Sequence, residues 1–302
     1  GHGVDLRTCP LHVPAIGAAL PVLADLITDL DLHPYDVPAR RGELKHVLVT
    51  ASPDDDLMVR FVLRSRRHLE RLHAALPDLR RSLPQLAVVS VNIQGVHQAV
   101  IEGPEEIVLT EEDRLLMRLS LPSPELGGQA GRRAESVELP LYLPTRSFFQ
   151  TNTAVAEALY ATARGWAEEA EPARVWDLFC GVGGFALAAA RAGFPRVTGV
   201  EVSSGAISSA ISAARHAGLS RSAATFIAED ATTWARAQAP EDMPDVIVVN
   251  PPRRGIGADL AAYLNQCDAP RVIYSSCNPA SLATDLAAMP TLRPIEGRLF
   301  DM

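Results

Sequence analysis

The chain has 302 residues, of which 47% are hydrophobic and 21% are charged, enough for one large domain or two ordinary ones. Its formal charge of −8 argues against a protein that coats nucleic acid by bulk charge, although that sum is compatible with a local basic patch. The most apolar stretch, 13–32, is interrupted by Pro21, Asp25 and Asp29. The first residues do not show the basic region followed by an apolar region that is typical of a secretory signal peptide. We therefore expect a cytoplasmic protein without a membrane span.

The first half of the sequence predicts an α+β domain. Its predicted strands are 46–50, 57–63, 86–93, 97–101 and 107–109, and its predicted amphipathic helix is 67–83. A Ser-Pro-Asp-Asp-Asp turn joins the first two strands, so we expect the sheet to be built on antiparallel hairpins. A connection rich in Ser, Pro, Gly and Arg over 119–135 predicts a boundary between a domain at 1–135 and a second domain at 136–302.

The second half alternates strands and helices. After a helix at 152–169, the predicted strands are 174–179, 197–202, 224–228, 246–249 and 272–274, and the predicted helices are 184–192, 206–218, 232–238, 259–267 and 279–288. Strands joined by helical crossovers form a parallel, doubly wound sheet, so the predicted fold class is α/β. Ligands bind such sheets beyond the carboxyl ends of the strands, which is where the chemically informative segments of this chain lie.

The first of these segments is DLFCGVGGF, residues 177–185. Glycines at a strand-to-helix turn, Gly181 among them, let the backbone approach a ligand and leave N–H groups of the new helix free. Glu201 ends the second strand, where a carboxylate can bind both ribose hydroxyls, and Asp230 closes the third, where a base would lie. The Gly-x-Gly-Gly spacing lacks the dinucleotide fingerprint and favours S-adenosylmethionine over NAD. An ordinary tight turn with solvated acids is the alternative.

The fourth strand ends in VNPPRRGIG, in which two prolines stiffen the loop and hold Asn250 toward the predicted pocket. An aromatic residue after Asn-Pro-Pro would suggest methylation of an exocyclic amino group, but Arg253 stands there. Arg253 and Arg254 are either phosphate ligands or solvated residues of a surface turn.

The fifth strand leads into YSSCNP, residues 274–279. Cys277 follows the apolar run at the start of a predicted helix, and a helix N-terminus stabilises the thiolate that attacks carbon. Its position favours a nucleophile over a core thiol. The other cysteines, Cys9, Cys180 and Cys267, complete no C-x-x-C pair, so neither a disulfide framework nor a local zinc site is predicted. We expect Cys180 to pack beneath the glycine turn.

Together, SFFQTN at 147–152, DLFCGVGGF, VNPPRRGIG and YSSCNP resemble, in this order, the RNA (uracil-5-)-methyltransferases. The resemblance covers almost the whole chain, and RRGELKHVLVT, MVRFVLRS and LFDM look most like the members that modify 23S ribosomal RNA rather than transfer RNA. It implies a Rossmann-like class I methyltransferase domain preceded by a smaller α+β RNA-binding domain. It also implies S-adenosylmethionine as the cofactor, 23S ribosomal RNA as the partner and a monomeric enzyme.

The resemblance implies roles at the matching positions. Gln150, the backbone around Phe179, Glu201 and Asn250 would contact S-adenosylmethionine, and Cys277 would be the nucleophile. C5 of uracil is too weak a nucleophile to take a methyl group unaided, but addition of a thiolate to C6 gives an enolate that is rich in electrons at C5. The uridine must be unstacked before its C6 can be reached.

Residues 40–81 are the predicted RNA-binding face, because ten Lys and Arg residues oppose six acidic ones in this segment of an acidic chain. The candidate RNA-binding residues are Arg40, Arg41, Lys45, Arg64, Arg66, Arg67, Arg253 and Arg254.

Two departures from the family pattern modify these expectations. Family members carry an N-terminal cysteine cluster for an iron–sulfur centre, and only Cys9 matches it, as its last member, so this chain alone cannot build the cluster. The family also continues past LFDM into a segment that holds the carboxylate general base. We therefore expect a fragment or a degenerate copy, with incomplete C-terminal strands, that binds cofactor but turns over slowly. The alternatives are the same reaction on transfer RNA, N-methylation of an amino group, and an inactive RNA- or cofactor-binding protein.

Overall fold

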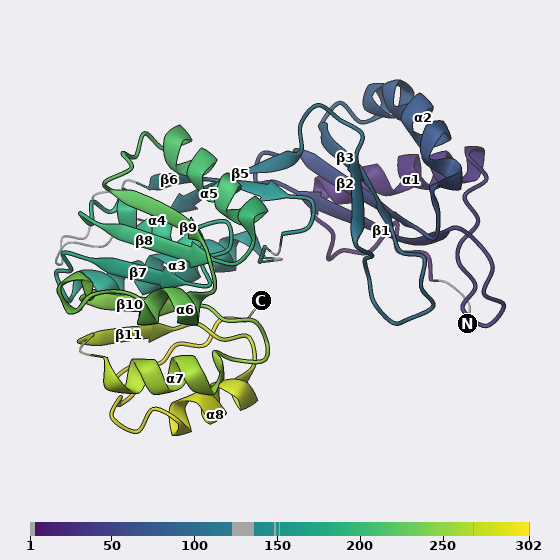
Figure 1. The fold of residues 1–302 in the computed structure, drawn as a ribbon. Helices are drawn as coiled ribbons and strands as arrows, with labels where there is room; N and C mark the ends of the chain where they lie inside the picture. The colour runs from purple at the N-terminus through teal and green to yellow at the C-terminus, as the bar shows by residue number, and fades with distance from the viewer. Residues whose placement is uncertain (1–3, 123–135, 148, 151, 268, 302) are drawn as a thin grey trace. The chain divides into compact units, whose positions relative to one another are not determined.

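The computed structural model describes residues 4–122, 136–147, 149–150, 152–267 and 269–301 (Figure 1). Contacts within the chain divide it into two compact units, Gly1–Met117 and Arg118–Met302. The predicted domain boundary at 135/136 comes later, at the end of the segment 123–135, which lies outside the described residues. No helix in the described ranges is long and apolar enough to cross a bilayer. The monomeric state and the cytoplasmic location stay predictions.

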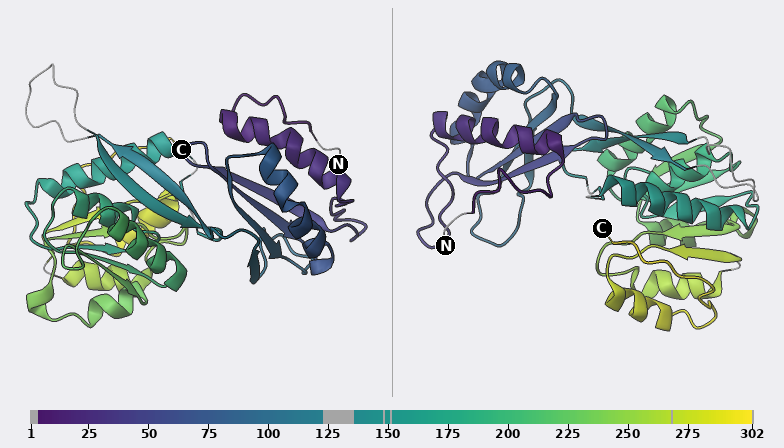
Figure 2. Two further views of the ribbon diagram at one scale, coloured as in Figure 1. Left: turned by 90° about the horizontal axis from the view of Figure 1, so that it is seen from above. Right: turned by 180° about the vertical axis from the view of Figure 1, so that it is seen from behind.

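Unit 1 contains a four-stranded mixed sheet in the order β1-β2-β3-β4. Its elements are α1 (Pro14–Asp29), β1 (Leu44–Ala51), β2 (Leu57–Leu63), the 3₁₀ turn η1 (Arg66–His68), α2 (Leu69–Ser82), β3 (Leu86–Ile93) and β4 (Glu105–Val108). The helices α1 and α2 contact each other on one face of the sheet (Figure 1, Figure 2). Alternate residues of β2, Leu57, Val59, Phe61 and Leu63, point into the apolar core between the sheet and these two helices.

Two sequence expectations for unit 1 are wrong, and one of its helices was missed. The strands β2 and β3 pair in parallel, because α2 serves as the crossover between them, so the sheet is not a set of antiparallel hairpins. The helix α1 was not predicted. Residues 97–101 form no strand, because the loop after β3 closes on the side chain of Asn92, which accepts from Gly103 N at 2.7 Å and donates to Gly103 O at 3.1 Å. Pairing therefore resumes only at Glu105.

Unit 2 is built around a parallel five-stranded sheet in the order β11-β10-β7-β8-β9. The strands of this sheet are β7 (Val175–Leu178), β8 (Val197–Glu201), β9 (Ala224–Ala228), β10 (Val246–Val249) and β11 (Arg271–Tyr274). A separate pair is formed by β6 (Val137–Pro144) and β5 (Arg114–Leu121), and the division between the two units falls within β5. The helices of unit 2 are α3 (Thr153–Glu168), α4 (Gly184–Arg191), α5 (Ser204–His216), α6 (Ala231–Arg236), α7 (Gly257–Gln266) and α8 (Pro279–Ala287), with a 3₁₀ turn η2 at Pro240–Asp242. The strands and helices predicted between 152 and 288 are confirmed to within two residues at each end.

The two faces of this sheet are covered by different helices (Figure 1). On one face α6 and α7 pack over Trp176, Ile247 and Val249, and the ring of Trp234 meets Trp176 edge-on at 4.8 Å between ring centres. On the other face α4 contacts both α3 and α5. In this sheet the first strand along the chain, β7, lies beside the fourth, β10, so the chain reverses its direction of winding there. This switch point is where an open α/β sheet binds its ligand.

Candidate active site

A strained glycine turn follows β7. Phe179 has φ 66°, and Gly181 and Gly183 have φ 54° and 91°, so three residues of this short segment take the left-handed conformation. Phe179 pays a steric penalty there, which is a common feature of functional sites. A Cβ on Gly184 would lie 2.5 Å from the ring of Tyr160, so α4 can begin this close to α3 only with glycine. The turn thus places the N-terminus of α4 at the carboxyl end of β7.

A buried carboxyl group, Asp177, lies under this turn. Its Oδ2 accepts a hydrogen bond from Ala186 N at 2.9 Å, and its Oδ1 has no partner within the described part of the chain. Complete burial, reinforced by the negative charge of Glu201, raises the pKa of Asp177 to about 8. A buried oxygen without a partner is rare, and one beside a glycine turn is available to a bound ligand or an ordered water. Cys180 is buried in the same turn, as predicted, and its burial raises the pKa of its thiol.

The predicted ribose and base ligands follow β8 and β9. Glu201 ends β8, and its Oε1 accepts from Ser203 N at 2.9 Å. Asp230 caps α6 by accepting from Thr233 N at 2.9 Å and from Thr233 Oγ1 at 3.0 Å, and these bonds lower its pKa, with a smaller effect from Arg254. A hollow of about 320 Å³ opens beside Asp230 and is lined by Asp230, Thr232, Thr233, Arg236, Ile256, Gly257, Ala258 and Asp259.

Cys277 and Asn250 follow two paired strands. Val249 of β10 lies opposite Tyr274 of β11, and Ser275 N donates to Val249 O at 2.9 Å. Cys277 is exposed just before α8, and its neighbour Asn278 caps that helix by accepting from Ala280 N at 3.1 Å. The same side chain donates from Nδ2 to Arg253 O at 2.9 Å, so the segment that carries Cys277 is bonded to the loop that carries Asn250.

A second connection, which we call the Asp285 bridge, links α8 to the end of β11 and to the loop that follows Asn250. The buried carboxylate of Asp285 on α8 accepts from Tyr274 OH at 2.5 Å and from Ile256 N at 3.0 Å. Burial and the bond to Asp285 raise the pKa of Tyr274. A Cβ on Gly255 would lie 2.3 Å from Asp285 Oδ2, so only glycine fits there. The sequence contained a signal for this bridge, because Asp285 stands three residues after Leu282 on the apolar side of a helix.

Gln150 is half-buried immediately before α3, and Asn152 caps that helix by accepting from Val155 N at 3.2 Å. The neighbouring residues 148 and 151 of the SFFQTN motif lie outside the described residues, as does 302 of LFDM. The arrangement of unit 2 therefore brings Phe179, Gly181, Glu201, Asp230, Asn250 and Cys277 to the carboxyl edge of one sheet. The glycine turn, the unpartnered Oδ1 of Asp177 and the carboxylate of Glu201 fit the amino acid and ribose parts of S-adenosylmethionine.

The candidate RNA-binding residues differ in whether their side chains already form hydrogen bonds or ion pairs within the chain. Lys45 bonds to Gln94 Oε1 and Val96 O, and Arg66 pairs with Glu105. Burial lowers the pKa of Lys45, with a further effect of Arg64. The remaining candidates are placed as follows: Arg64 pairs with Glu43 and donates to Arg40 O, Arg41 and Arg67 line a hollow of unit 1, and Arg253 and Arg254 are exposed on the Asn250 loop.

The residues described do not fit an iron–sulfur cluster. Cys9 is half-buried, and no group of three or more His, Cys, Asp or Glu side chains in the described ranges is arranged to hold a metal ion. Four thiolates are the usual ligands of such a cluster. We therefore derive no role for Cys9 in metal binding.

Comparisons with known proteins identify the family to which the chain is similar. A family model described as tRNA (Uracil-5-)-methyltransferase matches residues 141–302. Two relatives are named 23S rRNA (uracil(747)-C(5))-methyltransferase RlmC. The protein from Halothiobacillus neapolitanus is 48% identical over 99% of this chain, and the protein from Pectobacterium atrosepticum is 44% identical over 100% of it. The aligned region covers 75% of each relative.

Among solved structures, the Pyrococcus abyssi tRNA (uracil-54, C5)-methyltransferase in complex with S-adenosyl-L-homocysteine has a TM-score of 0.72 and 22% identity. The match covers 95% of this chain and 64% of that one, so the chain spans less than two thirds of the solved enzyme. This likeness confirms the α/β methyltransferase fold with its mostly parallel sheet. The extent of the family match and the identity to the RlmC proteins establish that the chain belongs to the RNA (uracil-5-)-methyltransferase family.

Proposed function

We propose that this chain methylates C5 of a uridine in 23S ribosomal RNA, with S-adenosylmethionine as the methyl donor and Cys277 as a covalent nucleophile. The observation that carries the proposal is the exposed thiol at the carboxyl end of β11, bonded through Asn278 to the Asn250 loop. The choice of RNA rests on the 44–48% identity to proteins named for 23S rRNA methylation.

The cofactor is assigned to the edge formed by β7, β8 and β10. Glu201 accepts hydrogen bonds from the ribose hydroxyls. The turn at Phe179 and Gly181, together with Gln150, holds the amino acid part of the cofactor. The base lies near Asp230 and Asn250. S-adenosylmethionine supplies an electrophilic methyl group on a sulfonium centre. The positive charge of this group favours a site with carboxylates, and Glu201 and Asp230 provide two.

Cys277 activates the uracil ring. Its thiolate forms a bond to C6, and the electrons of the C5–C6 double bond move toward O4 to give an enolate. C5 of the enolate would then form a bond to the methyl carbon, and the bond from that carbon to the sulfonium sulfur would break, leaving a neutral thioether. Loss of the C5 proton to a base restores the double bond and breaks the S–C6 bond, which returns the thiolate. The RNA is held by basic residues, for which the candidates remain those named from the sequence, including Arg253 and Arg254 beside the loop of Asn250.

RNA with 5-fluorouridine at the target tests this chemistry, because fluorine at C5 cannot leave as a proton and the adduct accumulates after methyl transfer. We expect a denaturation-resistant complex with the parent chain and with Cys267→Ala, and none with Cys277→Ala. Cys267 is a matched control because it caps the far end of α7 and is half-buried. Adduct formation by Cys277→Ala would refute the nucleophile, and methylation by Cys277→Ala would indicate N-methylation instead.

The description of the matching family favours transfer RNA as the second candidate substrate. Methyl transfer to separately transcribed 23S and transfer RNA fragments distinguishes the two, and the ribosomal fragment should contain the uridine equivalent to position 747 of the relatives' substrate. We expect label in the ribosomal fragment. Exclusive labelling of transfer RNA would overturn our choice, and binding of both ligands without adduct or product would identify an inactive binding protein.

A further inference from the structure

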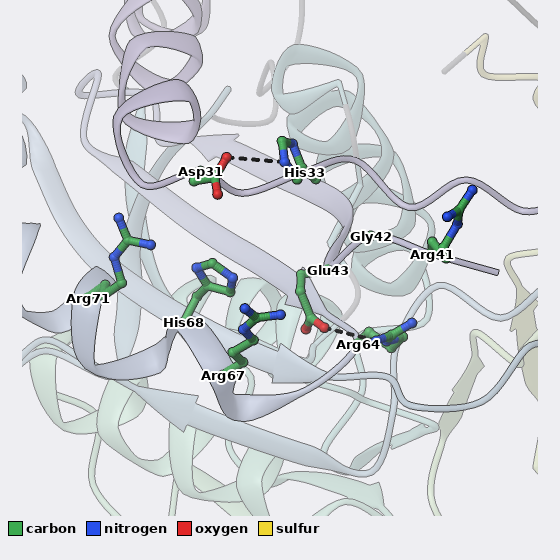
Figure 3. A pocket seen from close by; sticks show the side chains of 9 residues that line it. All are labelled: Asp31, His33, Arg41, Gly42, Glu43, Arg64, Arg67, His68 and Arg71. Carbon is green, nitrogen blue, oxygen red and sulfur yellow. Dashed lines mark ion pairs between the residues drawn. The ribbon is translucent and has the colours of Figure 1, made fainter. Parts of the chain in front are cut away.

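A basic hollow of about 370 Å³ lies within unit 1, and none of its lining residues has a role in the methyl-transfer step proposed above (Figure 3). Its lining comes from the segment after α1, the approach to β1, the end of β2, and the turn into α2. The lining residues are Asp31, His33, Arg41, Gly42, Glu43, Arg64, Arg67, His68 and Arg71. Four arginines therefore face two carboxylates.

Both carboxylates of the hollow are already engaged. Glu43 is buried, pairs with Arg64 at 3.2 Å between Oε1 and Nη2, and accepts from Ser65 Oγ at 2.7 Å. Asp31 pairs with His33 at 3.2 Å. The side chains of Arg41, Arg67 and Arg71, in contrast, have neither an ion pair nor a hydrogen bond to any described residue. The hollow thus has uncompensated positive charge.

A buried histidine gives an independent sign of a missing partner. His68 is only 7% exposed, lines the hollow, and its Nδ1 has no hydrogen-bond partner among the residues that the structure describes. In Figure 3 its ring lies between the side chains of Arg67 and Arg71. His68 is also the N-cap of the 14-residue helix α2, and its side chain makes no capping bond. The positive end of that helix therefore faces the same region and favours an anion.

We propose that this hollow binds a phosphate of the RNA backbone, with Arg67 and Arg71 as its principal ligands and Arg41 and His68 beside them. Guanidinium groups match the geometry of phosphate oxygens, and the hollow has room for a phosphate together with part of its ribose. The inference rests on the proposed RNA substrate and adds a built phosphate site in unit 1, which contributes affinity and leaves the methyl-transfer step to unit 2. His68 and Arg71 were not among the residues predicted from the sequence.

The test is the double variant Arg67→Gln/Arg71→Gln, both exposed and therefore tolerant of change. Its matched control is Arg80→Gln/Arg81→Gln, which removes the same charge from the other end of α2. The affinity for a 23S RNA fragment is measured by fluorescence anisotropy over a salt series. We expect about tenfold weaker binding by the first pair, with a slope of log K against log salt smaller by about 1, and parent-like values for the control.

The outcomes separate this inference from the proposed function. Parent-like affinity and slope in Arg67→Gln/Arg71→Gln, or an equal loss in the control, would overturn the phosphate site while the 5-fluorouridine adduct could still form. If instead no RNA yields an adduct with the parent chain, the proposed function fails. A thermal-shift series with inorganic phosphate forms the last arm. If phosphate raises the melting temperature of the parent but not of the variant, and the variant binds RNA as tightly as the parent, the hollow binds a small free anion and the proposed RNA phosphate site is wrong.

Discussion

The carboxyl group of Asp177 makes the stability of unit 2 depend on pH. Its pKa is about 8 in the folded chain and has an ordinary value of 3.8, so between these limits the folded state holds a proton that the unfolded state has lost. Stability from this group is therefore greatest at low pH and falls as the pH rises toward 8. The fall amounts to about 1.4 kcal/mol for each pH unit within the window.

Asp177→Asn should remove this dependence. The free energy of unfolding of the parent, relative to the variant, should fall by about 1.4 kcal/mol per unit between pH 5 and pH 7. Urea unfolding followed by tryptophan fluorescence measures it, because Trp166, Trp176 and Trp234 all belong to unit 2. Parallel pH profiles for the two proteins would contradict a raised pKa.

Glu201 gives a prediction for the cofactor. If its carboxylate binds the ribose hydroxyls, Glu201→Gln should weaken S-adenosylmethionine binding about tenfold, the loss expected for a charge-assisted hydrogen bond. The glutamine retains an oxygen that can accept from Ser203 N, so the local turn is kept. Calorimetry measures the affinity, and Glu229→Gln, an exposed residue at the end of the next strand, is the control. Equal affinities in all three proteins would exclude Glu201 as a ligand.

At the scale of elements, the Asp285 bridge makes α8 a support for the loops of Asn250 and Cys277. Removing the carboxylate leaves the half-buried Tyr274 OH and the buried Ile256 N without their acceptor. Asp285→Ala should therefore lower the free energy of unfolding of unit 2 by roughly 2–4 kcal/mol and slow adduct formation with 5-fluorouridine RNA.

Asp285→Asn tests whether the acceptor or the charge matters, because Tyr274 OH and Ile256 N both donate to Oδ2, and an amide oxygen in that place keeps the acceptor without the charge. We expect a smaller loss than in Asp285→Ala, measured by the same urea unfolding. Tyr274→Phe removes one bond and should cost about 1 kcal/mol. If Asp285→Ala unfolds at the parent's midpoint, the bridge contributes nothing to the support of these loops.

The elements of unit 2 could be predicted from the sequence because their apolar runs are short, separated and punctuated by turn residues. The YSSCNP segment and the glycine turn could be placed at the carboxyl edge of the sheet because each follows a buried strand. The elements of unit 1 were harder to predict. Pro21, Asp25 and Asp29 interrupt the apolar pattern of α1, so no helix was predicted there. The 14-residue helix α2 separates β2 from β3, and the sequence did not indicate whether these two strands pair in parallel or antiparallel. Pairing between strands is long-range information that a local pattern does not contain.

The charge pattern of 40–81 shows the same limit for the candidate site. Arg60 counts toward the basic excess but is buried, where it bonds to Glu102 and Glu106 from outside the segment. Arg66 likewise pairs with Glu105. Only the tertiary structure separates these neutralised arginines from Arg41, Arg67 and Arg71, which share a hollow. The unpartnered Nδ1 of His68 had no signal in the sequence.

For the whole molecule, a chain of formal charge −8 can bind RNA only through local basic surfaces. We expect log K for a 23S fragment to fall with log salt with a slope of about −3, as for roughly four phosphate contacts. The affinity for S-adenosylmethionine should hardly change over the same salt range. A slope below −6 would indicate a far wider RNA contact than the hollow of unit 1 and the arginines of the Asn250 loop provide.

The Asp285 bridge also offers a way to observe α8 directly. The amide hydrogen of Ile256 is bonded to a buried carboxylate from that helix rather than to the backbone of its own helix or sheet. Its exchange with deuterated solvent therefore requires α8 to move away, whereas amides inside β10 exchange only when the sheet opens. The exchange rate of this single hydrogen, compared with those of Val246–Val249, measures how often α8 detaches from the loop that precedes α7.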